Sequence, residues 1–139
     1  MKSGDGTGMQ GLGLMVLRLA VGVVFVMHGG QKLFIYGFHN VAGMMTRMGM
    51  PLPGVFAVVV TLIEFLGGWA LLLGLLTRCA ALALAIDMLV AILKVHLRNG
   101  FFLPRGFEFA FSMLAANVAL LLAGPGAAAI DSLLFKRRS

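Results

Sequence analysis

The sequence predicts an all-α membrane protein built as an antiparallel bundle of four transmembrane helices. The chain has 139 residues, of which 60% are hydrophobic and 12% are charged. Soluble domains average about 45–50% apolar and about 25% charged residues, so this chain has more apolar surface than a soluble core can bury. A helix needs roughly 20 apolar residues to cross a bilayer, and four windows qualify, at residues 12–36, 55–76, 78–97 and 107–124.

Glycine and proline mark the limits of these windows. Tyr-Gly at 36–37 closes the first, Pro-Leu-Pro-Gly at 51–54 opens the second, and Gly-Pro-Gly at 124–126 ends the fourth. Only Leu-Thr-Arg at 76–78 separates the second window from the third, and such a short connection joins antiparallel neighbours. We therefore expect one membrane domain over 1–139, with polar tails at 1–11 and 131–139.

The charge pattern indicates a lipid partner. A net charge of +6 would point to nucleic acid in a soluble protein, but here the basic residues are scattered between apolar runs and end in Lys-Arg-Arg at 136–138. Anionic lipid headgroups explain this pattern better, and no nucleic-acid partner is expected. Four spans place both termini on one side, which also holds Lys2 and Arg78. The positive-inside rule then predicts cytoplasmic termini in a plasma or inner membrane.

Cysteine and methionine usage limits the chemistry. Cys79 is the only cysteine, which excludes an intramolecular disulfide, a CxxC pair and a thiolate metal cluster. The ten methionines lack a Met-x-x-Met cluster that meets a histidine, so we interpret them as packing residues and expect no metal site. A redox role would need electrons from a cofactor or a partner.

Small residues recur on the first two predicted helices. In lipid, glycine lets two helix backbones approach closely, and this packing role is our interpretation of the pattern. The glycines concerned are Gly22, Gly29, Gly30, Gly67, Gly68 and Gly74.

Ionisable residues at membrane depth are the first candidates for a functional site. Helix rise places Arg18 roughly 9 Å, Asp87 roughly 13 Å and Glu64 roughly 17 Å from the side that bears the termini. We expect these three to form one buried polar cluster. Each charge costs at least about 2.5–3.5 kcal/mol at the bilayer centre, so the cluster either fixes helix register or forms a proton relay or ligand pocket.

A second polar layer is predicted closer to the opposite surface. His28 and Lys32 share one face of the first helix, and His96 and Glu108 lie at a similar depth on the third and fourth. His96 falls about opposite Asp87 on an ideal helix, so we expect it to face away from the bundle centre. His28 and Lys32 either meet a ligand or reach the interface to contact water.

Four segments together resemble the DoxX family of bacterial and archaeal membrane proteins. They are LRLAVGVVFVMHGGQKLF (17–34), LIEFLGGWALLLGLLTR (62–78), HLRNGFFLPRGFEFAF (96–111) and LLLAGPG (120–126), in the order that the family has them. The resemblance covers nearly the whole chain. It implies a four-helix protein associated with quinol oxidase or thiosulfate:quinone oxidoreductase complexes, or with assemblies linked to oxidative stress and thiol redox.

The resemblance also extends the list of candidate residues, because Gln31 and Asn99 come from it alone. Together with the residues found by depth, the predicted ligand-binding set is His28, Gln31, Lys32, His96, Asn99 and Glu108. No intrinsic cofactor is expected, and a quinone is the ligand that the resemblance favours.

Three functions stay open at this point. In a quinone-binding subunit of a redox complex, His28 and Lys32 would bind the headgroup while Glu64 or Glu108 moves protons. In a small-molecule transporter, the predicted buried cluster would be the coupling site, and four helices would need a homo-oligomer. A scaffold would hold redox or stress-response enzymes at the membrane through the basic tail. None of these requires the chain to be catalytic alone.

Overall fold

The computed structural model describes residues 8–135, and these residues contain helices and connecting turns only. Two helices carry π-helical segments at one end. In chain order the elements are α1 (Met9–Gly30), the π segment η1 (Gln31–Tyr36), α2 (Gly37–Arg47), α3 (Pro53–Leu73), α4 (Thr77–Ala91), the π segment η2 (Ile92–His96), the 3₁₀ turn η3 (Leu97–Asn99), α5 (Glu108–Ala123) and α6 (Ile130–Phe135).

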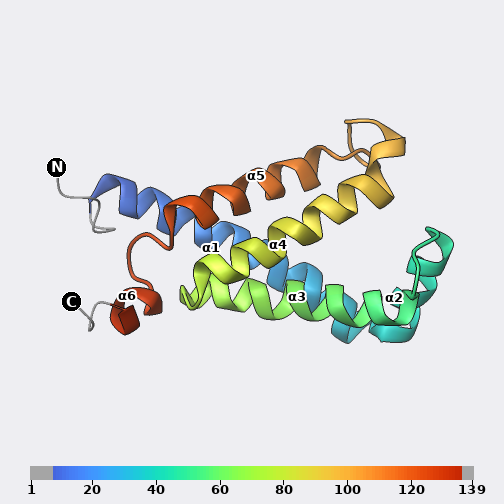
Figure 1. Cartoon of the computed structure of the whole chain (residues 1–139), viewed down its shortest axis with the longest axis horizontal. Helices are drawn as coiled ribbons and strands as arrows, with labels where there is room; N and C mark the ends of the chain where they lie inside the picture. Colours follow the sequence, from blue (N-terminus) through green and yellow to red (C-terminus); the bar gives the residue numbers. More distant parts are fainter. Residues whose placement is uncertain (1–7, 136–139) are drawn as a thin grey trace.

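The helices α1, α3, α4 and α5 lie side by side in alternating directions (Figure 1). α1 packs on α3, α3 on α4, α4 on α5, and α5 back on α1, while α2 packs on α3. We call the end with α6 and the α3–α4 turn the terminal end, and the end with α2 and the α4–α5 connection (100–107) the loop end. The two ends of the described chain therefore lie at the same end of the molecule (Figure 1).

Length and composition make this a multi-pass membrane protein. Three helical runs among the described residues are long and apolar enough to cross a bilayer: Met9–Arg47, Pro53–Leu73 and Thr77–Asn99. α5 is apolar but has only 16 residues, which is about 24 Å of helix against about 30 Å of hydrocarbon. Large apolar side chains such as Leu66 and Leu122 are exposed on the outside of the helices, where lipid solvates them.

The first helical run is longer than the sequence predicted. Gly37 does not end it: with φ +77°, this glycine turns the chain, and α2 continues to Arg47. Glycine adopts this positive φ without the steric cost that a side chain would add. At the other terminus, residues 131–135 of the predicted polar tail belong to α6 (Ile130–Phe135), while 1–7 and 136–139 lie outside the described residues.

Three of the six glycines, Gly22, Gly29 and Gly68, bring α1 and α3 into backbone contact, which confirms the predicted packing role for these three. A Cβ atom on Gly29 would lie 2.4 Å from the backbone nitrogen of Phe65, and one on Gly68 would lie 2.5 Å from that of Val26. Gly22 faces the carbonyl oxygen of Gly68 at 3.0 Å by the same measure. No larger residue fits at Gly29 or Gly68 unless the two helices move apart.

Candidate functional site

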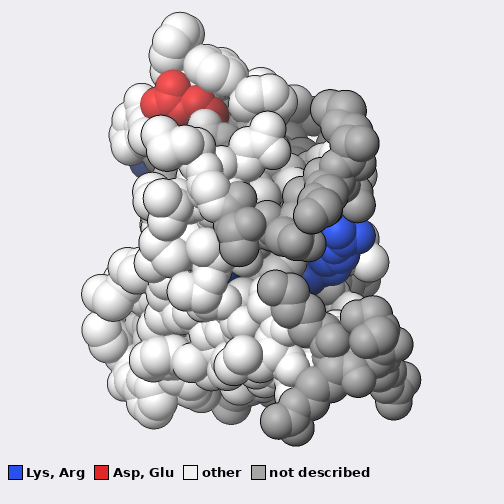
Figure 2. Space-filling view, turned by 90° about the vertical axis from the view of Figure 1, so that its left-hand side faces the viewer, with Lys and Arg blue, Asp and Glu red and all other residues white. Residues whose placement is uncertain are grey.

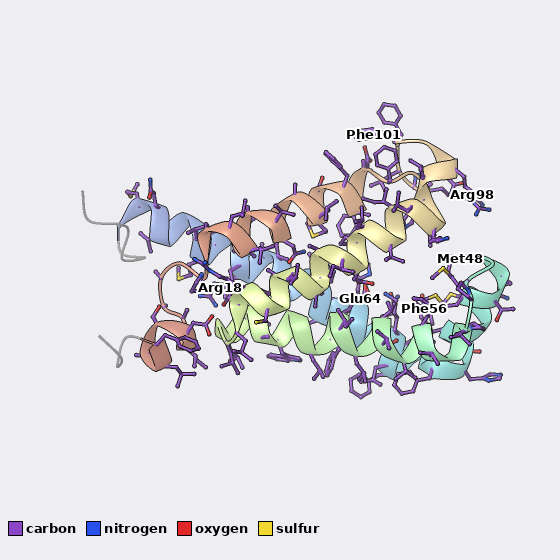
Figure 3. The ribbon with its side chains drawn as sticks, in the orientation of Figure 1. Arg18, Met48, Phe56, Glu64, Arg98 and Phe101 are labelled. Atoms are coloured by element: carbon purple, nitrogen blue, oxygen red, sulfur yellow. The ribbon has the colours of Figure 1, made fainter. Side chains whose placement is uncertain are left out.

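The main cavity lies in the loop-end half of the bundle and has a volume of about 460 Å³. Residues of α1, α2, α3, α4 and α5 line it, and the α4–α5 connection contributes Leu103, Pro104 and Gly106. Figure 3 shows Glu64 between α3 and α4, with Met48 and Phe56 nearer the loop end. The wall is mostly apolar, but five ionisable side chains interrupt it: His28, Lys32, Glu64, Asp87 and His96.

An ion pair between α3 and the π segment η1 crosses this cavity. Lys32 Nζ donates to Glu64 Oε2, and the two side chains are 21% and 5% exposed. Glu64 belonged to the predicted buried cluster and Lys32 to the predicted second layer. The two layers therefore meet at one site, because η1 lies beside the middle of α3.

Asp87 adds a second carboxyl group to this pair. Its residue is 8% exposed, and its side chain lines the same cavity as Glu64 and Lys32. The Oδ2 atom is buried and has no hydrogen-bond partner among the described residues. The cavity thus holds one lysine and two acidic side chains, which we call the charged triad (Lys32, Glu64 and Asp87).

Both π segments contribute residues to the cavity wall. Lys32 lies in η1, and Val95 and His96 lie in η2. π segments often occur at functional sites, and they turn the chain less per residue than an α-helix does. The prediction that His96 faces away from the centre is therefore wrong: η2 rotates it onto the cavity wall.

The histidines close the loop end of the cavity. The His28 ring lies 5.7 Å from that of Phe109, at 37°, and so joins α1 to α5. His96 Nδ1 lies 3.1 Å from the carbonyl oxygen of Arg105 in the α4–α5 connection. Both rings line the cavity, and they present polar nitrogen atoms beside an apolar wall.

Three predicted ligand residues lie outside the cavity wall. Gln31 is exposed, and Asn99 donates a 3.3 Å hydrogen bond to the carbonyl oxygen of Val95 on its own turn. Glu108 Oε1 accepts a 3.1 Å bond from the backbone nitrogen of Leu103, so it shapes the α4–α5 connection. Asn99 and Glu108 therefore stabilise the local structure of the loop end.

Arg18 does not pair with Asp87 or Glu64, so the predicted three-residue cluster is wrong. The guanidinium is buried at the terminal end, well apart from Glu64 (Figure 3). It donates to five backbone carbonyl oxygens, those of Leu71, Leu72, Pro125, Ala127 and Ala128, at 2.7–3.3 Å. The end of α3 leaves carbonyl groups without helical partners, and a long arginine on α1 can reach them.

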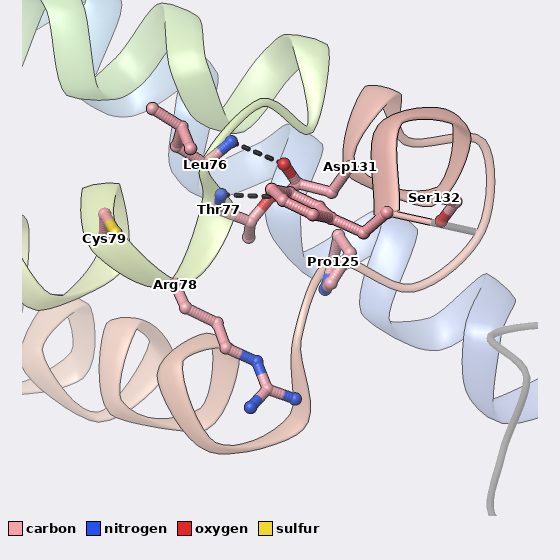
Figure 4. A pocket seen from close by; sticks show the side chains of 8 residues that line it. Leu76, Thr77, Arg78, Cys79, Pro125, Asp131 and Ser132 are labelled. Atoms are coloured by element: carbon pink, nitrogen blue, oxygen red, sulfur yellow. Dashed lines mark hydrogen bonds between the residues drawn. The ribbon is translucent and has the colours of Figure 1, made fainter. Parts of the chain in front are cut away.

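A smaller cavity of about 320 Å³ lies at the terminal end (Figure 4). Asp131 lies on its wall and caps α4: its Oδ1 accepts a 2.6 Å bond from the backbone nitrogen of Leu76, and its Oδ2 a 2.8 Å bond from that of Thr77. Arg78 and Cys79 line the same cavity. Seen from this end, the described surface is mostly uncharged, with one acidic and one basic patch (Figure 2).

Sequence reasoning missed several residues that matter for the site. Met45, Met48 and Met50 belong to α2 and the turn after it, and they close one side of the main cavity together with Met88 of α4. Their spacing in the sequence is typical of methionines that fill a helix-packing core. Only the position of α2 in the structure shows that they line a cavity. Within residues 8–135, no three His, Cys, Asp or Glu side chains gather as a metal site.

Comparison with known proteins agrees with this architecture. The family model described as DoxX matches residues 13–97, more than half of the chain and including Lys32, Glu64 and Asp87. The chain belongs to the DoxX family. No solved structure shows a significant match to this DoxX protein.

Three curated relatives of this DoxX protein cover most of its length. An uncharacterized membrane protein of Mycobacterium tuberculosis is 38% identical, over 89% of this chain and 82% of its own. The inner membrane protein YqjF of Escherichia coli is 34% identical, over 93% and 97%. CatD of Bacillus subtilis, named as a candidate oxidoreductase, is 31% identical, over 90% and 89%.

Proposed function

We propose that this DoxX protein binds a quinone in its main cavity, as the membrane subunit of an oxidoreductase complex. The observation that carries the proposal is the make-up of the cavity: apolar and methionine-rich walls enclose Lys32, His28 and two carboxyl groups. A ligand that fits must be largely apolar and must offer a few polar atoms in a fixed arrangement.

A quinone meets these requirements. Its headgroup has two carbonyl oxygens that accept hydrogen bonds, and the Lys32 ammonium and a His28 ring nitrogen are donors on the same wall. Flexible methionine side chains adapt to an apolar ring and tail. The carboxyl groups of Glu64 and Asp87 lie where protons would be exchanged with the headgroup.

The electrons would come from a partner protein. Cys79, the one cysteine of the chain, is exposed at the terminal end and lines the smaller cavity, so it cannot react with a ligand in the main one. The relative CatD supports an oxidoreductase context by its printed name. We therefore place this chain in a complex whose redox centre lies in another subunit.

Photo-crosslinking tests the ligand assignment. With an azidoquinone in detergent or liposomes, we expect labelled peptides from α1 and α3, and loss of most labelling in His28→Ala and Lys32→Ala. Gln31→Ala is the matched control, because Gln31 is adjacent in sequence but is exposed outside the cavity wall. Equal labelling of all variants would refute quinone binding at this site.

The proposal includes four membrane crossings with the terminal end in the cytoplasm. Arg78 at this end and the basic residues at 136–138 support that orientation through the positive-inside rule. Labelling of Cys79 reports the orientation directly, because this cysteine is exposed and the chain has no other cysteine that the reagent could label. A membrane-impermeant maleimide should label Cys79 in inside-out vesicles and spare it in intact spheroplasts. The reverse pattern would invert the topology.

A further inference from the structure

The charged triad carries one more acidic group than basic groups. Lys32 pairs with Glu64, so Asp87 is left without a cation of its own. If all three side chains were ionised, the triad would have a net charge of −1 in the middle of a membrane protein. An uncompensated carboxylate in an apolar environment is costly, and proteins avoid it by binding a proton or a cation.

Burial and the count of charges favour a proton. Glu64 and Asp87 are buried and line the same cavity, and Lys32 is the one cation that pairs with either of them among the described residues. A carboxyl group that carries a proton can donate a hydrogen bond to a neighbouring carboxylate, whereas two ionised carboxylates offer acceptors only. Asp87 Oδ2 is buried, has no partner among the described residues, and belongs to a residue that lines the cavity. A buried carboxyl oxygen without a partner is less costly when the carboxyl group carries a proton than when it carries a charge.

The other elements around the triad do not supply a compensating charge. α2 and α5 contribute uncharged side chains to the wall. His28 of α1 packs on Phe109, and His96 of η2 lies against the carbonyl oxygen of Arg105. Neither histidine forms a hydrogen bond or ion pair with Asp87 or Glu64 among the described residues.

We infer that Glu64 and Asp87 hold one shared, exchangeable proton, and that Asp87 presents it to a carbonyl oxygen of the bound ligand. The proton site follows from the triad alone. The contact with a ligand carbonyl rests on the proposed function. In this arrangement Lys32 holds the Glu64 carboxylate in place, and Asp87 is the group that meets the ligand.

Carbodiimide labelling of the full-length protein tests the proton site, because dicyclohexylcarbodiimide reacts with protonated carboxyl groups in apolar surroundings. We expect a covalent adduct on Asp87 or Glu64, found by peptide mass spectrometry, that decreases as the pH is raised. Glu108 and Asp131 are internal controls: both accept hydrogen bonds from backbone nitrogens outside the main cavity, and both should stay unmodified.

Infrared spectroscopy gives a second readout that does not depend on reagent access. The wild-type protein should show the carbonyl stretch of a protonated carboxyl group, and Asp87→Asn should lose or shift this band. Glu108→Gln, the matched variant, should leave it unchanged. Absence of this band in the wild type at neutral pH, or equal carbodiimide labelling of Glu108 and Asp131, would overturn the inference.

Ligand protection separates this inference from the proposed function. A quinone analogue should slow labelling of Asp87, because it would occupy the cavity that Asp87 lines. Labelling without protection would leave the proton site in place and refute quinone as its ligand. Absence of both the labelling and the carboxyl band would refute the shared proton, and quinone crosslinking that is lost in His28→Ala and Lys32→Ala would still support the ligand.

Discussion

Replacement of Gly29 with alanine is expected to separate α1 from α3 and to destabilise the protein. The added Cβ would lie 2.4 Å from the backbone nitrogen and 2.6 Å from the Cα atom of Phe65, and neither backbone atom can move without its helix. Overpacking of this kind costs roughly 1–3 kcal/mol, and more where backbone must shift. Gly68→Ala should act in the same way, because its Cβ would meet Val26 at 2.5 Å.

Gly13→Ala is the matched control. Gly13 lies on the same helix, α1, and a Cβ there would have nothing within 4 Å. Alanine is the better helix former, by up to about 1 kcal/mol, so this variant should be neutral or slightly more stable. SDS titration followed by fluorescence of Trp69, the one tryptophan, measures all three variants. Equal stability of Gly29→Ala and Gly13→Ala would contradict close α1–α3 contact.

The helices and their glycine contacts could be predicted because each depends on local sequence. An apolar run such as 55–76 has to become a helix in lipid, where every backbone polar group must be paired internally. The glycines at positions 29 and 68 likewise indicate close packing against a neighbouring helix. The structure accordingly has α3 at Pro53–Leu73 and backbone contact at both glycines.

The partners of the charged residues could not be predicted in the same way. Depth was estimated on straight α-helices, but η1 and η2 are π segments that rotate the residues they contain. His96, the last residue of η2, consequently lines the cavity. Lys32 meets Glu64 because its long side chain reaches across to α3, which a depth estimated separately on each helix does not include. Nothing in the local sequence marks where a helix changes its hydrogen-bonding pattern. Arg18 was misassigned for a different reason: its acceptors are backbone carbonyls, which have no sequence signature.

Arg18→Gln is expected to be the most destabilising single change at the terminal end. The guanidinium is 1% exposed and joins α1 to the end of α3 and to the segment before α6. Hydrogen bonds from a charged donor contribute roughly 1.5–3 kcal/mol each, and buried acceptors left unpaired add to the cost. We expect a loss of about 3–5 kcal/mol in the free energy of unfolding, as for other broken buried charge contacts.

Two further variants show whether this effect comes from the hydrogen bonds. Arg18→Lys keeps the charge but has one nitrogen where the guanidinium uses three, so it should recover only part of the stability. Arg78→Gln changes an exposed arginine at the same end and should alter stability by no more than about 0.5 kcal/mol. Thermal unfolding in detergent compares the three.

Ligand labelling of the same variants decides between the two roles considered for Arg18. If Arg18 only stabilises the contact of α1 with α3 and the 125–128 segment, quinone crosslinking at α1 should stay intact in any Arg18 variant that still folds. The main cavity lies in the other half of the bundle. If Arg18→Lys folds with wild-type stability but loses crosslinking, Arg18 belongs to the ligand site after all. In that case the buried cluster expected from the sequence forms in the ligand-bound protein, and the arginine must leave its carbonyl partners to join it.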